Sequence, residues 1–164
     1  FSANDYVEQG KAFYFENRFE DAIADYDKAL QMEPENHKAW FSRGAAMVKL
    51  QQLEDALKSY DRALQIKPDL AEAWFGKGTV LGKQQDLDGA ISAYDRAIQL
   101  KPDFFLAWFG KARCYALQGK TDLVLENLQQ AIHLNGDRSK EAAKTDSAFD
   151  ALRENLQFQA LLNS

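Results

Sequence analysis

Residues 40–68 read WFSRGAAMVKLQQLEDALKSYDRALQIKP, and residues 74–102 read WFGKGTVLGKQQDLDGAISAYDRAIQLKP, so one pattern occurs twice in register. Pro34, Pro68 and Pro102 stand at one fixed interval, since 68 less 34 and 102 less 68 both give 34. A period in this range marks a stack of small structural units, each of which buries its apolar face only against a neighbour. The chain is therefore expected to be a tandem array that works through a surface.

Further columns of residues repeat in register with the prolines. They are Trp40, Trp74 and Trp108; Gly10, Gly44 and Gly78; Ala22, Ala56 and Ala90; Tyr26, Tyr60 and Tyr94; and Ala29, Ala63 and Ala97. A fourth copy is less faithful, with Ala112 in the glycine column, Leu128 in the tyrosine column and Gly136 in the proline column. The small residues predict close helix approach, and the aromatic residues are expected to fill the space that they leave.

Each copy is predicted to form two helices. Apolar and small residues recur at three- and four-residue steps over residues 40–48 and again over residues 53–66, which is the period of an amphipathic helix. Gln51 and Gln52 leave room only for a short turn, so the two helices should be antiparallel. Pro68 cannot continue the second helix and is expected to end the unit.

This arrangement resembles the tetratricopeptide repeat (TPR), a helix-turn-helix unit with the same small, aromatic and proline columns. The resemblance covers about residues 3–138, with repeats near 3–36, 37–70, 71–104 and 105–138. It implies an all-α solenoid, a right-handed superhelix of antiparallel helix pairs. It also implies a concave groove, lined by the first helices, that holds an extended peptide or a helix of a partner protein.

After residue 138 the columns fail, yet an apolar stripe continues among charged residues. The end of a solenoid exposes the apolar face of its last unit, so residues 139–164 are expected to form capping helices. The sequence of residues 143–164, AKTDSAFDALRENLQFQALLNS, also resembles carboxy-terminal segments that cap bacterial repeat proteins of this family.

The resemblance places candidate peptide-binding residues at three levels along each first helix. They are Val7, Phe41, Phe75 and Phe109 just after the tryptophan column, then Lys11, Ala45, Thr79 and Arg113 one turn further, then Tyr14, Phe15, Lys49 and Lys83. An apolar trough with cationic edges suits a peptide with apolar anchors and some acidic character. The alternative is that the phenylalanines pack between repeats as core, and both roles can hold for different faces of one ring.

Some members of the family bind carboxy-terminal peptides through a clamp of Lys, Asn and Arg side chains for two carboxylates. The matching positions here hold Val7 and Lys11 in the first repeat, Ser42 in the second, and Glu72 and Gly76 in the third. Nearly all donors of the clamp are missing and one charge is reversed. Recognition of a chaperone tail by that mechanism is therefore not expected.

Charge and hydropathy limit the other partners. The chain carries 20 Lys and Arg against 25 Asp and Glu, a net charge of −5, so no nucleic-acid partner is expected. The longest apolar run, Phe104 to Phe109, is far shorter than the roughly 20 residues that cross a bilayer, so no membrane insertion is expected. The chain begins at Phe1 and not at Met, which favours an excised or processed domain and leaves its compartment open.

No residues in the sequence stand at a spacing that predicts catalysis, a metal site or a cofactor. His37 and His133 fall in different units without a second ligand at metal-binding spacing. Cys114 stands in a column of small apolar residues, which favours a core position over a nucleophile. The leading hypothesis is a noncatalytic protein-protein interaction scaffold.

The alternative hypothesis is a self-associating assembly module that uses its terminal faces and forms a homo-oligomer. It rests on Phe13, Phe15 and Phe19, which lie near an amino-terminal end with no obvious preceding cap.

Overall fold

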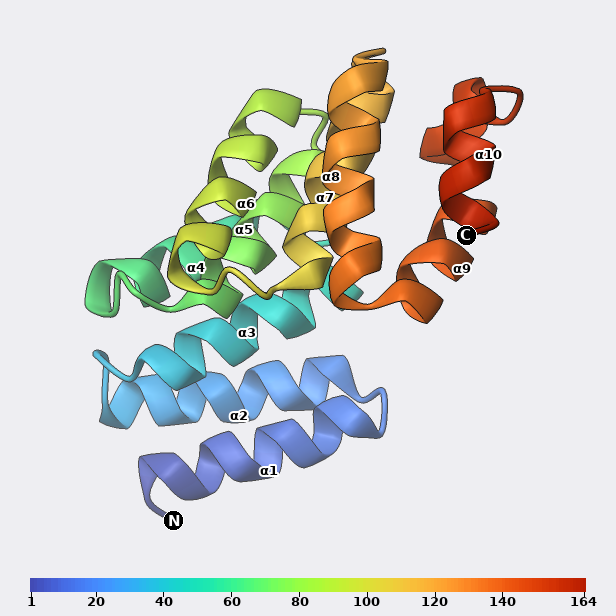
Figure 1. Cartoon of the computed structure of the whole chain (residues 1–164). Coiled ribbons are helices and arrows are strands. Elements are labelled where there is room, and N and C mark those ends of the chain that lie inside the picture. Colours follow the sequence, from blue (N-terminus) through green and yellow to red (C-terminus); the bar gives the residue numbers. More distant parts are fainter.

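The chain folds into antiparallel helix pairs that stack one upon the next. The computed structural model describes all residues from Phe1 to Ser164 and contains no strand. The pairs are α1 (Ala3–Phe15) with α2 (Phe19–Met32), α3 (His37–Lys49) with α4 (Leu53–Ile66), α5 (Ala71–Lys83) with α6 (Leu87–Leu100), and α7 (Phe105–Leu117) with α8 (Thr121–Leu134). Figure 1 shows the helix axes turning progressively from α1 and α2 to the upright α7 and α8. The predicted all-α solenoid is confirmed.

The turn inside each pair depends on one residue in the left-handed region of backbone space. These residues are Asn17, Gln51, Gln85 and Gly119, with φ of 61°, 59°, 65° and 72°. In the second pair the N–H of Gln52 then donates to the carbonyl of Met47 at 2.9 Å, which satisfies a carbonyl at the end of α3. Because the same turn recurs in all four pairs, each second helix returns along its first helix in the same way.

The tyrosine column joins each pair to the next. A Cβ added to Gly44 in α3 would lie 3.0 Å from the Tyr60 ring, and one added to Gly76 in α5 would lie 2.5 Å from it. The ring of Tyr60 therefore fills a slot between two successive first helices, where only glycine leaves enough room. Burial raises the pKa of Tyr60, and it raises the pKa of Tyr94 in the next slot to about 12.

A row of ion pairs also links successive repeats on the side of the second helices. The pairs are Arg43 with Asp27 at 2.7 Å, Lys77 with Asp61 at 2.7 Å, and Lys111 with Asp95 at 2.6 Å. Each cation also lies over the tryptophan ring three residues before it, at 5.4 to 5.9 Å from the ring centroid. The column thus fixes the second helix of one repeat to the first helix of the next.

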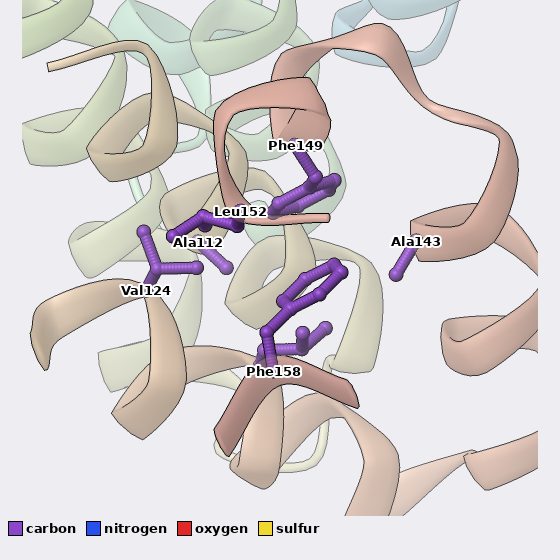
Figure 2. Packing of buried hydrophobic residues seen from close by; sticks show 7 residues of the cluster. Ala112, Val124, Ala143, Phe149, Leu152 and Phe158 are labelled. Atoms are coloured by element: carbon purple, nitrogen blue, oxygen red, sulfur yellow. The ribbon is translucent and has the colours of Figure 1, made fainter. Parts of the chain in front are cut away.

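The carboxy-terminal segment covers the last pair with three short elements, α9 (Gly136–Thr145), the 3-10 helix η1 (Ser147–Leu152) and α10 (Leu156–Leu162). Figure 1 shows α9 and α10 standing beside α8 at the end of the stack. Figure 2 shows Phe149, Leu152 and Phe158 gathered beside Ala112 and Val124. All five side chains are buried in one cluster, so this segment completes the core at the open end of the solenoid.

Candidate functional site

Two adjoining hollows lie along the first helices α1, α3 and α5. One has a volume of 290 Å³ and the other 270 Å³, and both are lined by Tyr14, Phe41 and Ala45. Since they share these side chains, we treat them as one feature, the first-helix groove. Of the candidate peptide-binding residues, eight line this groove: Lys11, Tyr14, Phe15, Phe41, Ala45, Lys49, Phe75 and Thr79.

The phenylalanines of the groove have one face in the core and another on the groove. The Phe41 ring lies 5.9 Å from the Tyr60 ring, and the Phe75 ring lies 5.7 Å from the Tyr94 ring, measured between centroids. Each is partly buried and also lines the groove. Each ring therefore packs against a core tyrosine and also lines the groove, which is compatible with a core role and a binding role for different faces of one ring.

Phe15 differs from these rings because almost nothing covers it. Its relative exposure is 81%, and it stands at the end of α1 beside Tyr14, with 5.6 Å between the ring centroids. A large apolar side chain at this level of exposure loses little packing when it is replaced, and it gains much when a ligand covers it.

The other four candidate residues do not line the groove. Val7 is only 1% exposed and packs in the core with Ala29 and Ala39, because its short side chain reaches only the neighbouring α2 and α3. Lys83 is exposed and does not belong to the lining. Phe109 and Arg113 are contacted by the carboxy-terminal segment, which therefore occupies these positions of the fourth repeat.

The cations at the groove are unequally engaged. Lys11 is paired with Glu8 at 3.0 Å, whereas Lys49 forms no ion pair with a carboxylate. The acidic Glu72 at the groove is paired with Lys101, with 3.7 Å between the charged atoms. The groove therefore presents accessible positive charge although the whole chain is acidic.

Sequence reasoning missed three aromatic residues of the groove lining. Tyr26 and Tyr60 reach it from the second helices through the slots that the small residues leave, and Phe104 reaches it from the residue before α7. The glycine columns were the sequence signal that could have shown that the tyrosine rings pass between the first helices. Phe104 packs 5.0 Å from the Phe75 ring, and only its place at the start of the apolar run pointed to it.

No other group of residues forms a recognisable chemical site. Cys114 is buried, and burial raises the pKa of its thiol to about 11, so the thiol stays protonated at neutral pH. No three His, Cys, Asp or Glu side chains are placed to hold a metal ion together. None of the helices combines the length and the hydropathy that spanning a membrane requires.

Comparison with family models identifies the repeats within residues 7–104. Two tetratricopeptide repeat models match, one over residues 7–71 and the other over residues 71–104, so together they cover more than half of the 164 residues. No curated protein matches the chain in a sequence comparison.

Solved structures share the fold at low sequence identity. The crystal structure of MamA protein superposes with a TM-score of 0.81 at 22% identity, covering 98% of this chain and 90% of that one. YrrB, described as a TPR protein with an unusual peptide-binding site, gives 0.74 at 21% identity, covering 96% and 81%. The first TPR of Spaghetti (RPAP3), bound to the HSP90 peptide SRMEEVD, gives 0.71 at 21% identity, covering 72% and 94%.

Proposed function

The chain belongs to the tetratricopeptide repeat family, and from that membership and the lining of the first-helix groove we propose that it binds an apolar segment of a partner protein there. The family is generally noncatalytic, and its fold supports a protein-interaction scaffold. Two of the structural neighbours are described as peptide-binding, which agrees with the proposal but is a property of those proteins.

The observation that carries the proposal is the exposure of Phe15, which lines a hollow whose other lining residues are aromatic or small side chains and Lys11. Covering such a ring removes apolar surface from water, at about 25 cal/mol per Å². A partner that buried Phe15 together with the free faces of Phe41 and Phe75 would gain several kcal/mol before the costs of association, by that coefficient. Modest affinity from a few anchors is therefore expected.

The same residues bear on self-association. Of the three phenylalanines that motivated it, Phe13 lies under the Arg18 guanidinium at 4.3 Å and Phe19 packs against the Tyr14 ring at 5.3 Å. Phe15 alone stays uncovered, and it lines the groove. We therefore favour a partner segment over a second copy, and a molar mass that rises with concentration in light scattering would reverse that preference.

An affinity pull-down with matched variants tests the proposal. We expect a specific partner to be retained by the wild-type chain and lost with Phe15→Ser, a change of an exposed side chain. Met32→Ser is the control, because Met32 on α2 is also exposed, at 52%, and lines neither hollow. A partner retained equally by all three proteins would contradict binding in the groove.

A further inference from the structure

The first-helix groove consists of one binding site that occurs twice. Seven residues line the hollow on α1 and α3, and each of them has a counterpart 34 positions later that lines the hollow on α3 and α5. Phe41 thus corresponds to Phe75, and Tyr26 corresponds to Tyr60. The two volumes, 290 and 270 Å³, agree as well. We refer to the hollow on α1 and α3 as subsite 1 and to the hollow on α3 and α5 as subsite 2.

The next step along the array differs from these two. There the counterpart of Phe41 and Phe75 is Phe109, and its ring is packed against Phe149 in the core that caps the last helix pair. A ligand of the groove therefore meets two equivalent subsites. A segment that fills both at once binds more tightly than one that fills either alone, because the second contact is made within one complex.

Helix packing sets the distance between the subsites. Each subsite lies between two successive first helices, and packed helices have axes about 8 to 10 Å apart, depending on the side chains between them. The Tyr60 ring stands between α3 and α5, since a Cβ added to Gly44 or to Gly76 would lie 3.0 or 2.5 Å from it. With a ring between the helices, the spacing is at the upper end of that range, about 10 Å.

Few backbone conformations place two side chains of a ligand at this spacing on one face. In a polyproline II helix, residues i and i+3 lie on the same face about 9.3 Å apart. In a β-strand, the residues of one face lie about 6.6 Å or about 13 Å apart. In an α-helix, residues i and i+7 share a face at about 10.5 Å. A polyproline II segment and an α-helix therefore fit the spacing, and a β-strand does not.

The wall between the subsites favours polyproline II over the α-helix. Tyr14, Phe41 and Ala45 line both hollows, so their side chains stand between the two anchors of a ligand. The Phe41 ring is held in place by the Tyr60 ring, with 5.9 Å between the centroids. An α-helix that filled both subsites would direct residues i+3 and i+4 against this wall. In polyproline II, residues i+1 and i+2 point about 120° away, so the segment crosses the wall without a side chain.

The lining of the groove also suits polyproline II chemically. Four of the seven residues at subsite 1 are aromatic, and proline-rich segments dock in grooves that are lined by aromatic side chains. A polyproline II backbone has no internal hydrogen bonds, so its carbonyl oxygens remain available to donors. Lys49 at subsite 2 is exposed and forms no ion pair, and its ammonium group is such a donor.

We infer that the first-helix groove takes a polyproline II segment of its partner, with apolar anchors at positions i and i+3. One anchor enters subsite 1 beside Phe15, and the other enters subsite 2 beside Lys49. This inference rests on the proposed function, because it specifies the conformation and the anchor spacing of the ligand of the same groove. A preformed polyproline II helix also loses little conformational freedom on binding.

Synthetic peptides with two phenylalanine anchors test the spacing. In a polyproline host the anchors stand two, three or four positions apart, and in an alanine-based helical host they stand seven positions apart. Fluorescence anisotropy of the labelled peptides gives their dissociation constants with the wild-type chain. We expect the peptide with anchors three positions apart to bind about tenfold more tightly than each of the others.

A thermodynamic cycle with Phe15→Ser tests where the anchors lie. For one anchor, its replacement by alanine and the Phe15→Ser change should each weaken binding about tenfold, and together hardly more, because both remove the same contact. For the other anchor the two losses should add. Phe15 is 81% exposed, so its replacement leaves the fold intact, and Met32→Ser serves as the control with unchanged binding. Additive losses for both anchors would overturn the inference.

The remaining outcomes separate the inference from the proposed function. Tightest binding by the helical peptide, or by anchors two or four positions apart, with a loss on Phe15→Ser, would overturn the inference and leave the proposed function standing. Equal binding of the three-position peptide to the wild type and to Phe15→Ser would contradict both. Absence of binding by every peptide would overturn the inference, and the pull-down would decide on the proposed function independently.

Discussion

The indole Nε1 of Trp74 donates a hydrogen bond to the carbonyl oxygen of Pro68 at 2.8 Å. The same bond joins Trp40 to Pro34 at 2.8 Å and Trp108 to Pro102 at 2.9 Å. The proline ends one repeat, and its carbonyl then anchors the first helix of the next. The tryptophan and proline columns therefore form one repeated contact, which sets how successive first helices are placed along the groove.

Replacement of Trp74 by Phe tests this device. The variant keeps an aromatic ring at position 74 but loses the indole N–H, so water must take its place at the Pro68 carbonyl. The free energy of unfolding should therefore fall by about 1 to 2 kcal/mol. Urea unfolding followed by circular dichroism measures the change. Trp108→Phe should behave alike, and an unchanged unfolding midpoint in both variants would show that the bond contributes nothing.

The tyrosine slot predicts coupling between Gly78 and Tyr94. A Cβ at Gly78 would lie 2.7 Å from the Tyr94 ring, so Gly78→Ala should destabilise by about 1 to 3 kcal/mol despite the better helix propensity of alanine. In the fourth repeat Ala112 and Leu128 occupy the same two columns and are both buried, so alanine in the glycine column is accommodated there beside leucine in place of tyrosine.

The double variant Gly78→Ala/Tyr94→Leu should therefore lose less stability than the sum of the two single variants. A double-mutant cycle from urea unfolding gives the coupling energy, which we expect to be about 1 kcal/mol for residues in direct contact. Strict additivity of the two changes would be inconsistent with a shared slot.

The turn column predicts opposite effects for two changes at equivalent positions. Gly119→Gln puts a side chain on a residue with φ of 72° and should cost about 1 to 2 kcal/mol. Gln51→Gly relieves the same strain at φ of 59°, and should stabilise by a few tenths of a kcal/mol up to about 1 kcal/mol after the added freedom of the unfolded chain is counted. Thermal unfolding of both variants checks the signs, and changes of the same sign would refute strain at this column.

The buried tyrosines predict a loss of stability at alkaline pH. The pKa of Tyr94 is raised to about 12, whereas the unfolded chain titrates near 10, so the folded state binds more protons than the unfolded state in between. Its contribution is fully present below pH 10 and is lost as the pH rises towards 12. Denaturant unfolding gives the free energy of unfolding at pH 8 and at pH 11. Its decrease between the two pH values should be smaller in Tyr94→Phe than in the wild type, by about 1 kcal/mol. Equal drops in the two proteins would contradict this assignment.

The repeats were predictable from the sequence because each column has a single physical cause. Proline at 34, 68 and 102 fixed the register, and the 3.6-residue period over 40–48 and 53–66 gave the helices. The groove was predictable for its first-helix side chains Phe41 and Phe75, since their columns follow from that register.

The ends of the array were less predictable. Val7 follows the same column as Phe41, but a smaller side chain in a terminal repeat turns into the core instead of the groove. The stripe of residues 139–164 indicated a cap, yet nothing in its periodicity showed that Phe149 would reach Phe109 or that Asp146 would reach Arg113. Such contacts depend on how the chain turns after α9, and a local pattern holds no information on that direction.

Titration of the three proteins with the partner recovered in the pull-down, labelled with a fluorophore, tests the central claim, that the first-helix groove is the binding surface. Fluorescence anisotropy gives the dissociation constants for the wild type, Phe15→Ser and the control Met32→Ser. The account predicts a Kd about tenfold higher for Phe15→Ser, equivalent to about 1.4 kcal/mol, and an unchanged Kd for Met32→Ser. Equal dissociation constants for all three proteins would contradict it.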